Sequence, residues 1–326
     1  MRAPVPVGRR ALQGLTLLAG RTDARRGERR MANTALPDVS DTARWVAVYR
    51  AAESERPDAL FRDPFASRLA GDLGREIAER MPSSMRRNSW PLVVRTRLID
   101  DLVLKSVAQG ADRVLNLAAG LDCRPYRLPL PSSLTWVEAD LPALVDEKER
   151  ALASETPVCT LRRERVDLTH PAARNAFLDS ALQGSKRALV VTEGLLVYLE
   201  SADVRALGRD LAARTAISWW LLDVASPAVL RMMQRRTSSR LGESAQMRFG
   251  PAEGVRFFEP MGWKPLDIKS LFREAAHMRR LPALLRLFSW LPEPDPERLG
   301  RRPWAAVVRY GRGEFPSAPG RPLSPA

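Results

Sequence analysis

Residues 113–128, RVLNLAAGLDCRPYRL, run from a short apolar segment into a turn of small residues and then into a polar segment. The apolar part predicts a buried β-strand over Arg113–Leu117. Ala118, Ala119 and Gly120 carry little or no side chain, so the backbone of this turn can approach a bound molecule closely. Three explanations fit such a turn: a nucleotide-like cofactor, a phosphate, or a tight reversal of the chain with no ligand.

Strands and helices alternate along the chain around this turn. Further strands are predicted at 134–139, 188–192 and 217–224, with a weaker one before Val166 and two closing strands near 263–268 and 304–310. Helices are predicted from Asp41, with Trp45, Val48, Tyr49 and Ala52 on one side, from about Pro64, over 92–107, 142–154 and 202–214, and after Pro227. Continuous apolar runs indicate a mostly parallel sheet covered on both faces. The predicted fold class is therefore α/β and doubly wound, with ligands bound beyond the carboxyl ends of the strands.

Composition suggests where the folded domain begins and ends. Residues 1–35 are rich in arginine and are expected to be a disordered extension or the product of a start codon assigned too far upstream. Residues 36–312 are expected to form one domain, made of a helical cap (36–110), a cofactor-binding core (111–225) and a substrate-side insert with the final strands (226–312). The proline-rich tail 313–326 is expected to be disordered.

Charge and cysteine content limit the classes of partner. The net charge of +14 could attract nucleic acid, but the arginines are scattered among acidic residues, so a solvated surface is favoured and no nucleic-acid partner is expected. Cys123 and Cys159 lie far apart without metal-type spacing, which argues against a disulfide framework or a zinc site. No apolar run approaches the roughly 20 residues that span a bilayer. A cytoplasmic protein without a membrane partner is expected, and monomer or homodimer stays open.

The acid at the end of the second strand narrows the choice of ligand. Asp140 follows Gly120 by 20 residues, where an acid can accept hydrogen bonds from a ribose diol, although it could instead cap the helix from Pro142. A dinucleotide fingerprint requires G-x-G-x-x-G/A, whereas this turn reads A-A-G-L-D-C, and Asp122 would repel a pyrophosphate. These features favour an adenosine with an uncharged linker and an amino-acid end.

Several ordered motifs then give a specific resemblance. Leu117–Leu128, LAAGLDCRPYRL, resembles the signature of the leucine carboxyl methyltransferase family of S-adenosylmethionine-dependent enzymes, in its bacterial small-molecule branch. The likeness extends to RWVAVYRAAESERPDALFRDPFASRLAG, VRTRLIDD, VEADLP and VTEGLLVYL and covers roughly 41–310. The resemblance implies a class I methyltransferase fold, Rossmann-like, with a seven-stranded sheet, an N-terminal helical cap, a C-terminal insert, S-adenosyl-L-methionine as cofactor and no metal.

The resemblance also implies cofactor contacts for individual residues. By position in the motifs they are Arg95 for the cofactor's carboxylate, Ala118 and Gly120 for the methionine portion, Asp140 for the ribose, Asp167 and Leu168 for the adenine, and Glu193 beside the methionine end. If the alignment to the family motif is shifted by two residues, Arg97 takes the place of Arg95 as the contact of the carboxylate. Arg44 is a looser candidate for a second contact with the same carboxylate. A purely structural explanation exists for some of them, since Asp167 could cap the next segment and Arg95 could lie on the surface.

No catalytic residue is predicted. Methyl transfer from a sulfonium needs no metal and no covalent enzyme intermediate, and a carboxylate acceptor is already ionised; a hydroxyl acceptor would benefit from a general base. His170, His277 and Tyr198 are weak candidates for that base. The expected activity is O-methyl transfer to a carboxylate or hydroxyl of a small molecule, of the kind found in secondary metabolism. A NAD-dependent oxidoreductase and an RNA-directed or nucleic-acid-binding protein are the alternatives.

The insert contains an apolar segment, LPALLRLFSWLP at 281–292. Packing on the core is expected for it, with lining of an acceptor pocket as the alternative.

Overall fold

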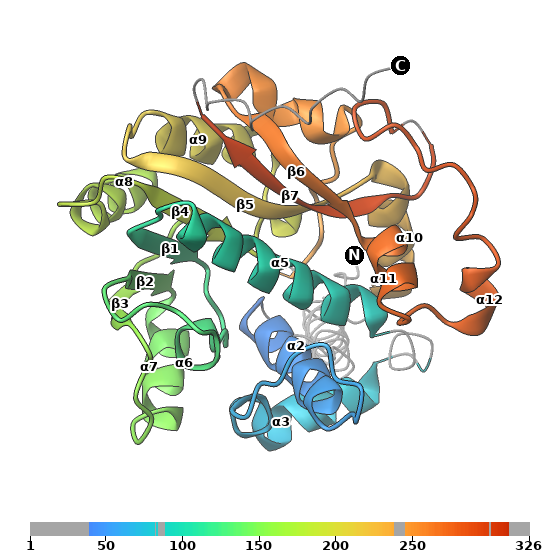
Figure 1. Cartoon of the computed structure of the whole chain (residues 1–326), viewed down its shortest axis with the longest axis horizontal. Helices are drawn as coiled ribbons and strands as arrows, with labels where there is room; N and C mark the ends of the chain where they lie inside the picture. Colours follow the sequence, from blue (N-terminus) through green and yellow to red (C-terminus); the bar gives the residue numbers. More distant parts are fainter. Residues whose placement is uncertain (1–38, 82, 84–88, 238–244, 300, 313–326) are drawn as a thin grey trace, which may run out of the picture.

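A computed structural model describes residues 39–81, 83, 89–237, 245–299 and 301–312, and every statement below concerns these residues (Figure 1). The predicted N-terminal extension and C-terminal tail lie outside them, and the proposed domain boundaries stay a prediction. The strands are β1 (Arg113–Leu117), β2 (Thr135–Asp140), β3 (Thr160–Arg165), β4 (Ala188–Thr192), β5 (Ile217–Ala225), β6 (Lys264–Ser270) and β7 (Ala305–Gly311).

The helices alternate with these strands as the sequence predicts, with some additions. They are α2 (Val39–Ser54), α3 (Ala66–Arg80), α5 (Trp90–Ala108), α6 (Arg124–Arg127), α7 (Pro142–Ala151), α8 (Pro171–Ala181), α9 (Ser201–Ala212), α10 (Pro227–Thr237), α11 (Leu271–His277) and α12 (Ala283–Arg286), with 3₁₀ helices η1 (Leu196–Tyr198) and η2 (Gly254–Met261). Helix α8 was not predicted. In α2 the side chain of Ala52 is exposed, so it does not share the buried side of Trp45 and Tyr49 as expected.

The strands form one sheet in the order β3-β2-β1-β4-β5-β7-β6. Strands β1 to β5 are parallel to one another, and β7 runs antiparallel to both β5 and β6. Strands β1 and β4 begin and end at the predicted residues. The prediction of a doubly wound, mostly parallel, seven-stranded sheet is therefore confirmed.

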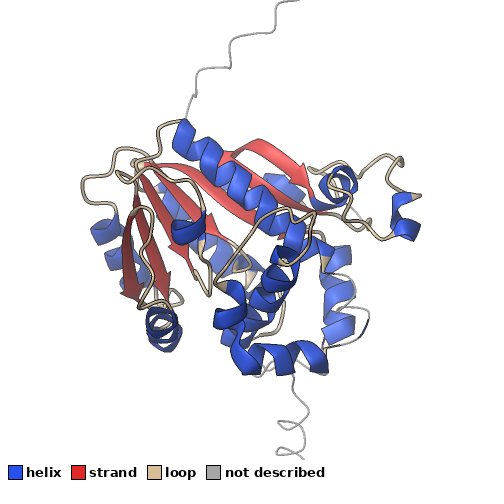
Figure 2. Cartoon of the chain, turned by 60° about the horizontal axis from the view of Figure 1, so that its bottom comes forward, coloured by secondary structure: helices blue, strands red, loops and turns tan. Residues whose placement is uncertain are grey.

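Helices cover both faces of this sheet (Figures 1 and 2). Helices α5 and α11 pack on one face, where Leu98 and Leu271 meet alternate residues of the strands, such as Val114. Helices α8, α9 and η2 pack on the other face, which Leu115 and Leu117 enter. Burial on both faces explains why the strands read as continuous apolar runs rather than alternating ones.

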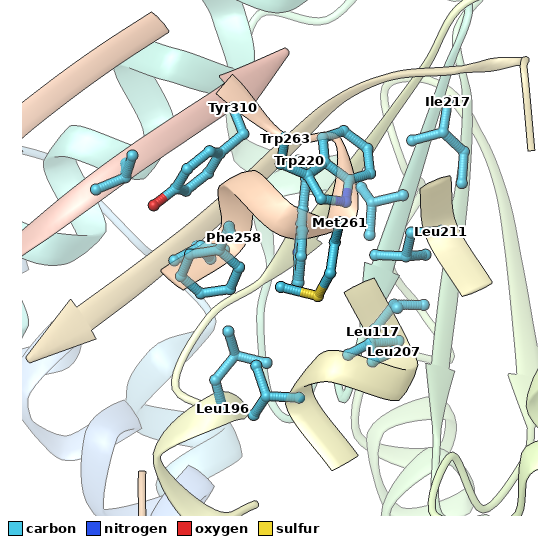
Figure 3. Packing of buried hydrophobic residues seen from close by; sticks show 14 of the residues in the cluster. Leu117, Leu196, Leu207, Leu211, Ile217, Trp220, Phe258, Met261, Trp263 and Tyr310 are labelled. Carbon is cyan, nitrogen blue, oxygen red and sulfur yellow. The ribbon is translucent and has the colours of Figure 1, made fainter. Parts of the chain in front are cut away.

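An aromatic cluster fixes the antiparallel end of the sheet (Figure 3). Trp220 of β5 packs edge-on against Phe258 and Trp263, with ring centroids 5.3 and 5.5 Å away. Helix α9 approaches this cluster closely at Gly208, whose carbonyl accepts a 2.9 Å hydrogen bond from Trp263 Nε1. A Cβ atom at position 208 would lie 2.5 Å from Met261 Sδ, so a side chain there would require the Met261 side chain to shift.

Helix α2 of the predicted cap lies over the turn that follows β1. A Cβ atom at Gly120 would lie 3.2 Å from the Cβ atom of Ala43, and Ala47 shares a buried cluster with Leu121 and Cys123. The small side chains of α2 therefore allow the helix to rest directly on the turn.

The apolar segment 281–292 does not pack on the core as expected. Leu281 is buried and Leu285 packs against the cluster under α5, but the other large apolar side chains are exposed. Helix α11 already covers this part of the sheet with Leu271 and Ala275, and the four-residue α12 lies beyond it at the edge of the molecule (Figure 1). The exposed apolar side chains of this segment are Leu284, Leu287, Phe288, Trp290 and Leu291.

Candidate functional site

The carboxyl ends of the five parallel strands meet at one edge of the sheet, and the predicted cofactor residues follow them there. Arg95 reaches the same edge from α5, where it bonds to Glu193, the residue after β4, and to Asp223 near the end of β5. The strands carry the others: Ala118 and Gly120 after β1, Asp140 at the end of β2, Asp167 and Leu168 after β3, and Glu193 after β4. The fold therefore brings the seven predicted residues to one side of the sheet.

The turn after β1 has an unusual backbone. Ala118 and Gly120 have φ angles of 53° and 50°, in the left-handed region that favours glycine. For an alanine this conformation costs about 1–2 kcal/mol. The main consequence of alanine at position 118 therefore lies in the backbone conformation rather than in the space that its methyl group fills.

Asp140 is bonded directly to this turn. Its Oδ2 atom accepts a 2.6 Å hydrogen bond from the amide of Gly120, and its Oδ1 atom accepts one of 2.8 Å from the amide of Leu141. Burial raises the pKa of Asp140, although these two amide bonds act in the opposite direction. A carboxylate has about four acceptor positions, so two remain for a ribose diol. The alternative that Asp140 caps the next helix is not met, because the N-cap residue of α7 is Leu141 and no side chain forms a cap hydrogen bond there.

The segment after β3 runs beside the end of β2, since the amide of Val166 donates to the carbonyl of Asp140 at 2.9 Å. Asp167 follows, and its Oδ1 atom accepts bonds from the amide and hydroxyl of Thr169, at 2.9 and 2.6 Å. The Thr169 hydroxyl bond is the main cause that lowers the pKa of Asp167. Asp167 thus closes its own loop as well as lying near Asp140, and Leu168 packs partly against the core. An adenine contact for this pair stays a prediction.

Glu193 and Arg95 lie against each other. Arg95 Nε donates to Glu193 Oε1 at 3.0 Å, and Arg95 Nη1 donates to Asp223 Oδ2 at 3.3 Å. The other oxygen of Asp223 accepts a 2.6 Å bond from the amide of Gly194. Arg95 is therefore held by two carboxylates, while its Nη2 group keeps donors that could meet a third.

These residues end a longer series of buried ion pairs, which we call the ion-pair chain. It links four arginines and five carboxylates from α2 to β5: Arg50, Asp63, Arg127, Asp100, Arg124, Asp122, Glu193, Arg95 and Asp223. Arg124 is its centre, with bonds of 2.7 Å to Asp100, 2.8 Å to Asp122 and 2.8 Å to Glu193.

The ion-pair chain lowers the pKa of two of its acids, Glu193 and Asp122, despite burial. Burial alone would raise the pKa of Glu193, but the charges of Arg124 and Arg95 bring it below its usual value. Burial likewise opposes ionisation of Asp122, and Arg124 with other nearby cations lowers its pKa well below its usual range. Because Asp122 points into the protein and is neutralised by Arg124, the sequence argument that it would repel a pyrophosphate no longer holds.

The donor set fits the methyl donor that the motifs imply. Five carboxylates against four arginines leave the ion-pair chain one negative charge in excess, and S-adenosyl-L-methionine carries one net positive charge. Arg95 offers a planar donor group for a carboxylate, and Asp140 offers acceptors for a diol. When bound, the cofactor supplies a methyl group on a sulfonium sulfur.

The rival candidates lie elsewhere. Arg97 pairs with Asp101 at 3.0 Å and donates to the carbonyl of Leu60, so it points away from Glu193. Arg44 pairs with Asp41 and Glu147 beside a cavity of about 470 Å³ between α3 and α7. Arg44 is the one cofactor candidate that lines this cavity, and none of the seven residues gathered at the sheet edge does, so we do not assign the cavity to the cofactor.

Sequence reasoning missed several residues of this site. Asp223 is an acid inside the apolar strand β5, and this unusual placement is a sequence signal by which it could have been found. Arg124 and Asp100 are buried side chains of opposite charge that lie far apart in the sequence and come into contact only in the folded chain. Tyr198 is half-buried and bonded to Thr42 of α2, and desolvation raises the pKa of its hydroxyl while that bond opposes the effect.

In the described part of the chain, no group of three or more His, Cys, Asp or Glu side chains is placed to hold a metal ion. Both histidines are exposed, with 72% of the His170 side chain and 76% of the His277 side chain accessible.

Comparison with known proteins agrees with this geometry. The model of a family described as leucine carboxyl methyltransferase matches residues 43–212. A proposed S-adenosyl-L-methionine-dependent methyltransferase of Parafrankia sp. (strain EAN1pec) is 32% identical over 277 residues, covering 81% of this chain and 89% of that protein. One of the same description from Mycobacteroides abscessus (strain ATCC 19977) is 36% identical over 196 residues, covering 55% of this chain and 62% of that protein.

Among solved structures, a proposed methyltransferase from Thermobifida fusca YX matches with a TM-score of 0.50. The match has 16% identity and covers 86% of this chain and 96% of that one. At this identity the likeness concerns the fold alone.

Proposed function

Since the chain belongs to the leucine carboxyl methyltransferase family and is an S-adenosyl-L-methionine-dependent methyltransferase, we propose that it methylates an oxygen atom of a small molecule. The acceptor oxygen belongs to a carboxylate or a hydroxyl group, in a compound of the kind found in secondary metabolism. The observation that carries the proposal is the placement of Arg95 between Glu193 and Asp223, at the same sheet edge as the bonded pair Asp140 and Gly120.

We assign each residue of this edge a binding role. Asp140 accepts hydrogen bonds from the ribose, and Arg95 receives the carboxylate of the amino-acid end. Glu193 attracts the ammonium group and holds Arg95 in position. Ala118 and Gly120 let the backbone approach the ligand, and Asp167 with Leu168 borders the adenine. The chain's contribution to rate is then mainly positioning, which can supply up to about 7–11 kcal/mol.

A carboxylate acceptor is favoured over a hydroxyl by the state of the available bases. A carboxylate needs no proton removed, whereas a hydroxyl gains from a general base within hydrogen-bond reach. His170 and His277 point into solvent, and Tyr198 has a raised pKa that disfavours the phenolate form. No step in the proposed reaction therefore uses a protein base.

The alternatives from the sequence have less support. An activity as a NAD-dependent oxidoreductase is not supported, because the chain belongs to a family of methyltransferases. Binding to nucleic acid requires free cations along one surface, whereas many surface arginines here are paired. Arg165 bonds with Asp146 and Glu149, for example, and Arg214 with Asp179. We therefore also propose that the acceptor is not a nucleic acid.

A labelling experiment tests the acceptor class. The full chain is incubated with S-adenosyl-L-methionine labelled in its methyl group and with matched pairs of carboxylic acids and phenols or alcohols. Mild alkali then releases label from a methyl ester but not from a methyl ether. We expect alkali-labile label on a carboxylic acid. Transfer only to nitrogen, or only to added RNA, would contradict the proposal.

A reducing, cytoplasmic setting is proposed from the cysteines. Cys123 and Cys159 are free and buried, and burial raises the pKa of their thiols to about 12 and about 11. Such thiols stay protonated and have little tendency to form disulfides.

A further inference from the structure

The exposed apolar side chains of 284–291 form a surface that the methyl-transfer site does not use. We call it the α12 patch: Leu284, Leu287, Phe288, Trp290 and Leu291. The side chains of Trp290 and Leu284 are the most exposed, at 77% and 70% of their full surface. Figure 1 shows α12 at the outer rim of the molecule, beyond α11.

The α12 patch belongs to an ordered turn structure. The amides of Leu285 and Arg286 donate to the carbonyl of Pro282, and the amide of Leu291 donates to that of Phe288. The Arg286 guanidinium donates to the carbonyl of Leu281 at 3.2 Å, which ties the turn to the buried residue before it. The backbone therefore holds the apolar side chains outward, and five large ones within eight consecutive residues mark an interaction site.

The surroundings of the α12 patch are basic. Arg279 and Arg286 are exposed beside it. The nearest acid along the chain, Glu293, is already engaged by Ser270 and by Arg273 at 3.2 Å. An apolar tip with a cationic rim complements the surface of an anionic bilayer, into which tryptophan, phenylalanine and leucine insert at the headgroup boundary.

A second copy of the chain is a poorer fit. Stable protein interfaces involve about 20–30 residues on each side, whereas the α12 patch offers five apolar side chains on a four-residue helix and the turn after it. Arginines on both copies would also repel each other across such a contact.

We propose that the α12 patch attaches the enzyme peripherally to an anionic phospholipid bilayer. The patch enters the interface, and Arg279 and Arg286 add electrostatic attraction. The expectation of no membrane partner rested on the absence of a spanning segment, and in the described residues no helix is long and apolar enough to cross a bilayer. Peripheral attachment needs no such helix, and it does not depend on the identity of the methyl acceptor.

Vesicle co-sedimentation of the full chain tests this proposal. The vesicles contain phosphatidylcholine alone or phosphatidylcholine with about one third phosphatidylglycerol. The test variant is Leu284→Ser with Trp290→Ser, and the control is Leu73→Ser, since Leu73 is an exposed leucine (47%) on α3, away from the patch. Because the altered side chains are exposed, we expect all variants to fold, and their unfolding temperatures verify this.

We expect binding to the anionic vesicles to fall about tenfold or more in the double variant and to stay unchanged in Leu73→Ser. Tryptophan quenching by brominated lipid should drop in Trp290→Phe while binding persists. Equal binding of the double variant and wild type would overturn the proposal, as would no binding of wild type to either vesicle. A concentration-dependent dimer that the double variant abolishes, without vesicle binding, would assign the surface to self-association instead.

Discussion

Asp140 Oδ2 accepts a 2.6 Å hydrogen bond from the amide of Gly120, and this bond joins the end of β2 to the turn after β1. The acid that is proposed to bind the ribose thus also sets the shape of the turn on which the rest of the cofactor would lie. Charge and backbone geometry at this position are therefore linked.

Replacing Asp140 separates these two contributions. In Asp140→Asn the amide oxygen can still accept from Gly120, but the charge is lost, so we expect the affinity for S-adenosylhomocysteine to fall about 10- to 150-fold, as for a charge-assisted bond of about 1.5–3 kcal/mol. Calorimetric titration measures this. Asp146→Asn, at an exposed acid of α7, should bind as wild type does. An undiminished affinity in Asp140→Asn would show that the ribose lies elsewhere.

Arg95 and Arg97 form a natural pair of test positions, two residues apart on α5. We expect Arg95→Lys to weaken binding of S-adenosylhomocysteine by about tenfold or more, because lysine lacks the planar donor group that meets a carboxylate in two places. Arg97→Lys should change binding less than about twofold, because Arg97 points to Asp101 and Leu60. Thermal-shift titrations of both variants measure the difference, and the reverse order would favour the alternative register.

The left-handed conformation of Ala118 predicts a stabilising change. Ala118→Gly removes a strain of about 1–2 kcal/mol but adds about 0.4–1 kcal/mol of chain entropy to the unfolded state. We expect a net gain of up to about 1.5 kcal/mol in the free energy of unfolding. Ala119→Gly, whose φ is not positive, should instead lose stability by about 1 kcal/mol. Denaturant unfolding compares the two, and a loss in Ala118→Gly would refute the strain.

Arg124 holds three buried carboxylates, so its removal leaves charges without compensation. Arg124→Met should destabilise the fold by about 3–5 kcal/mol, the usual effect of breaking a buried ion pair. Arg165→Met, which breaks solvent-exposed pairs on β3, should leave the free energy of unfolding nearly unchanged. Similar losses in both variants would mean that the ion-pair chain contributes no more than a surface pair.

The ion-pair chain also predicts how stability depends on pH. The pKa values of Asp122 and Glu193 are lower in the folded state than in the unfolded one. Their stabilisation is therefore fully present above about pH 5 and is lost as the pH falls through about 4 and below. We expect the unfolding temperature to fall between pH 5 and 3, and to fall less steeply in Asp122→Asn. Asp72→Asn, at an exposed acid, should follow wild type.

The interior strands could be predicted from sequence because they are buried on both faces. β4 reads as an apolar run and β1 as one interrupted only by Asn116 after its first residue, and the bounds predicted for both strands match the structure. The edge strand β3, TLRRER, is half exposed and charged, so its sequence carries a weaker signal. The segment 281–292 was misjudged because an apolar run on a helix looks the same whether it faces the core or a partner.

The site was predictable where one motif fixes one position, as for Asp140 beside Gly120. It was not predictable where function depends on side chains meeting across the fold. Arg124 and Asp100 are 24 residues apart and bond only because α5 and α6 pack together. Asp223 depends on the neighbour relation between β4 and β5, which sequence spacing does not encode.

The contact at Gly208 has an evolutionary consequence. A methyl group there would overlap the sulfur of Met261, so the Met261 side chain would have to shift or be replaced. In homologues, we therefore expect alanine or serine at 208 to occur together with a shorter residue at 261, so that the two positions covary.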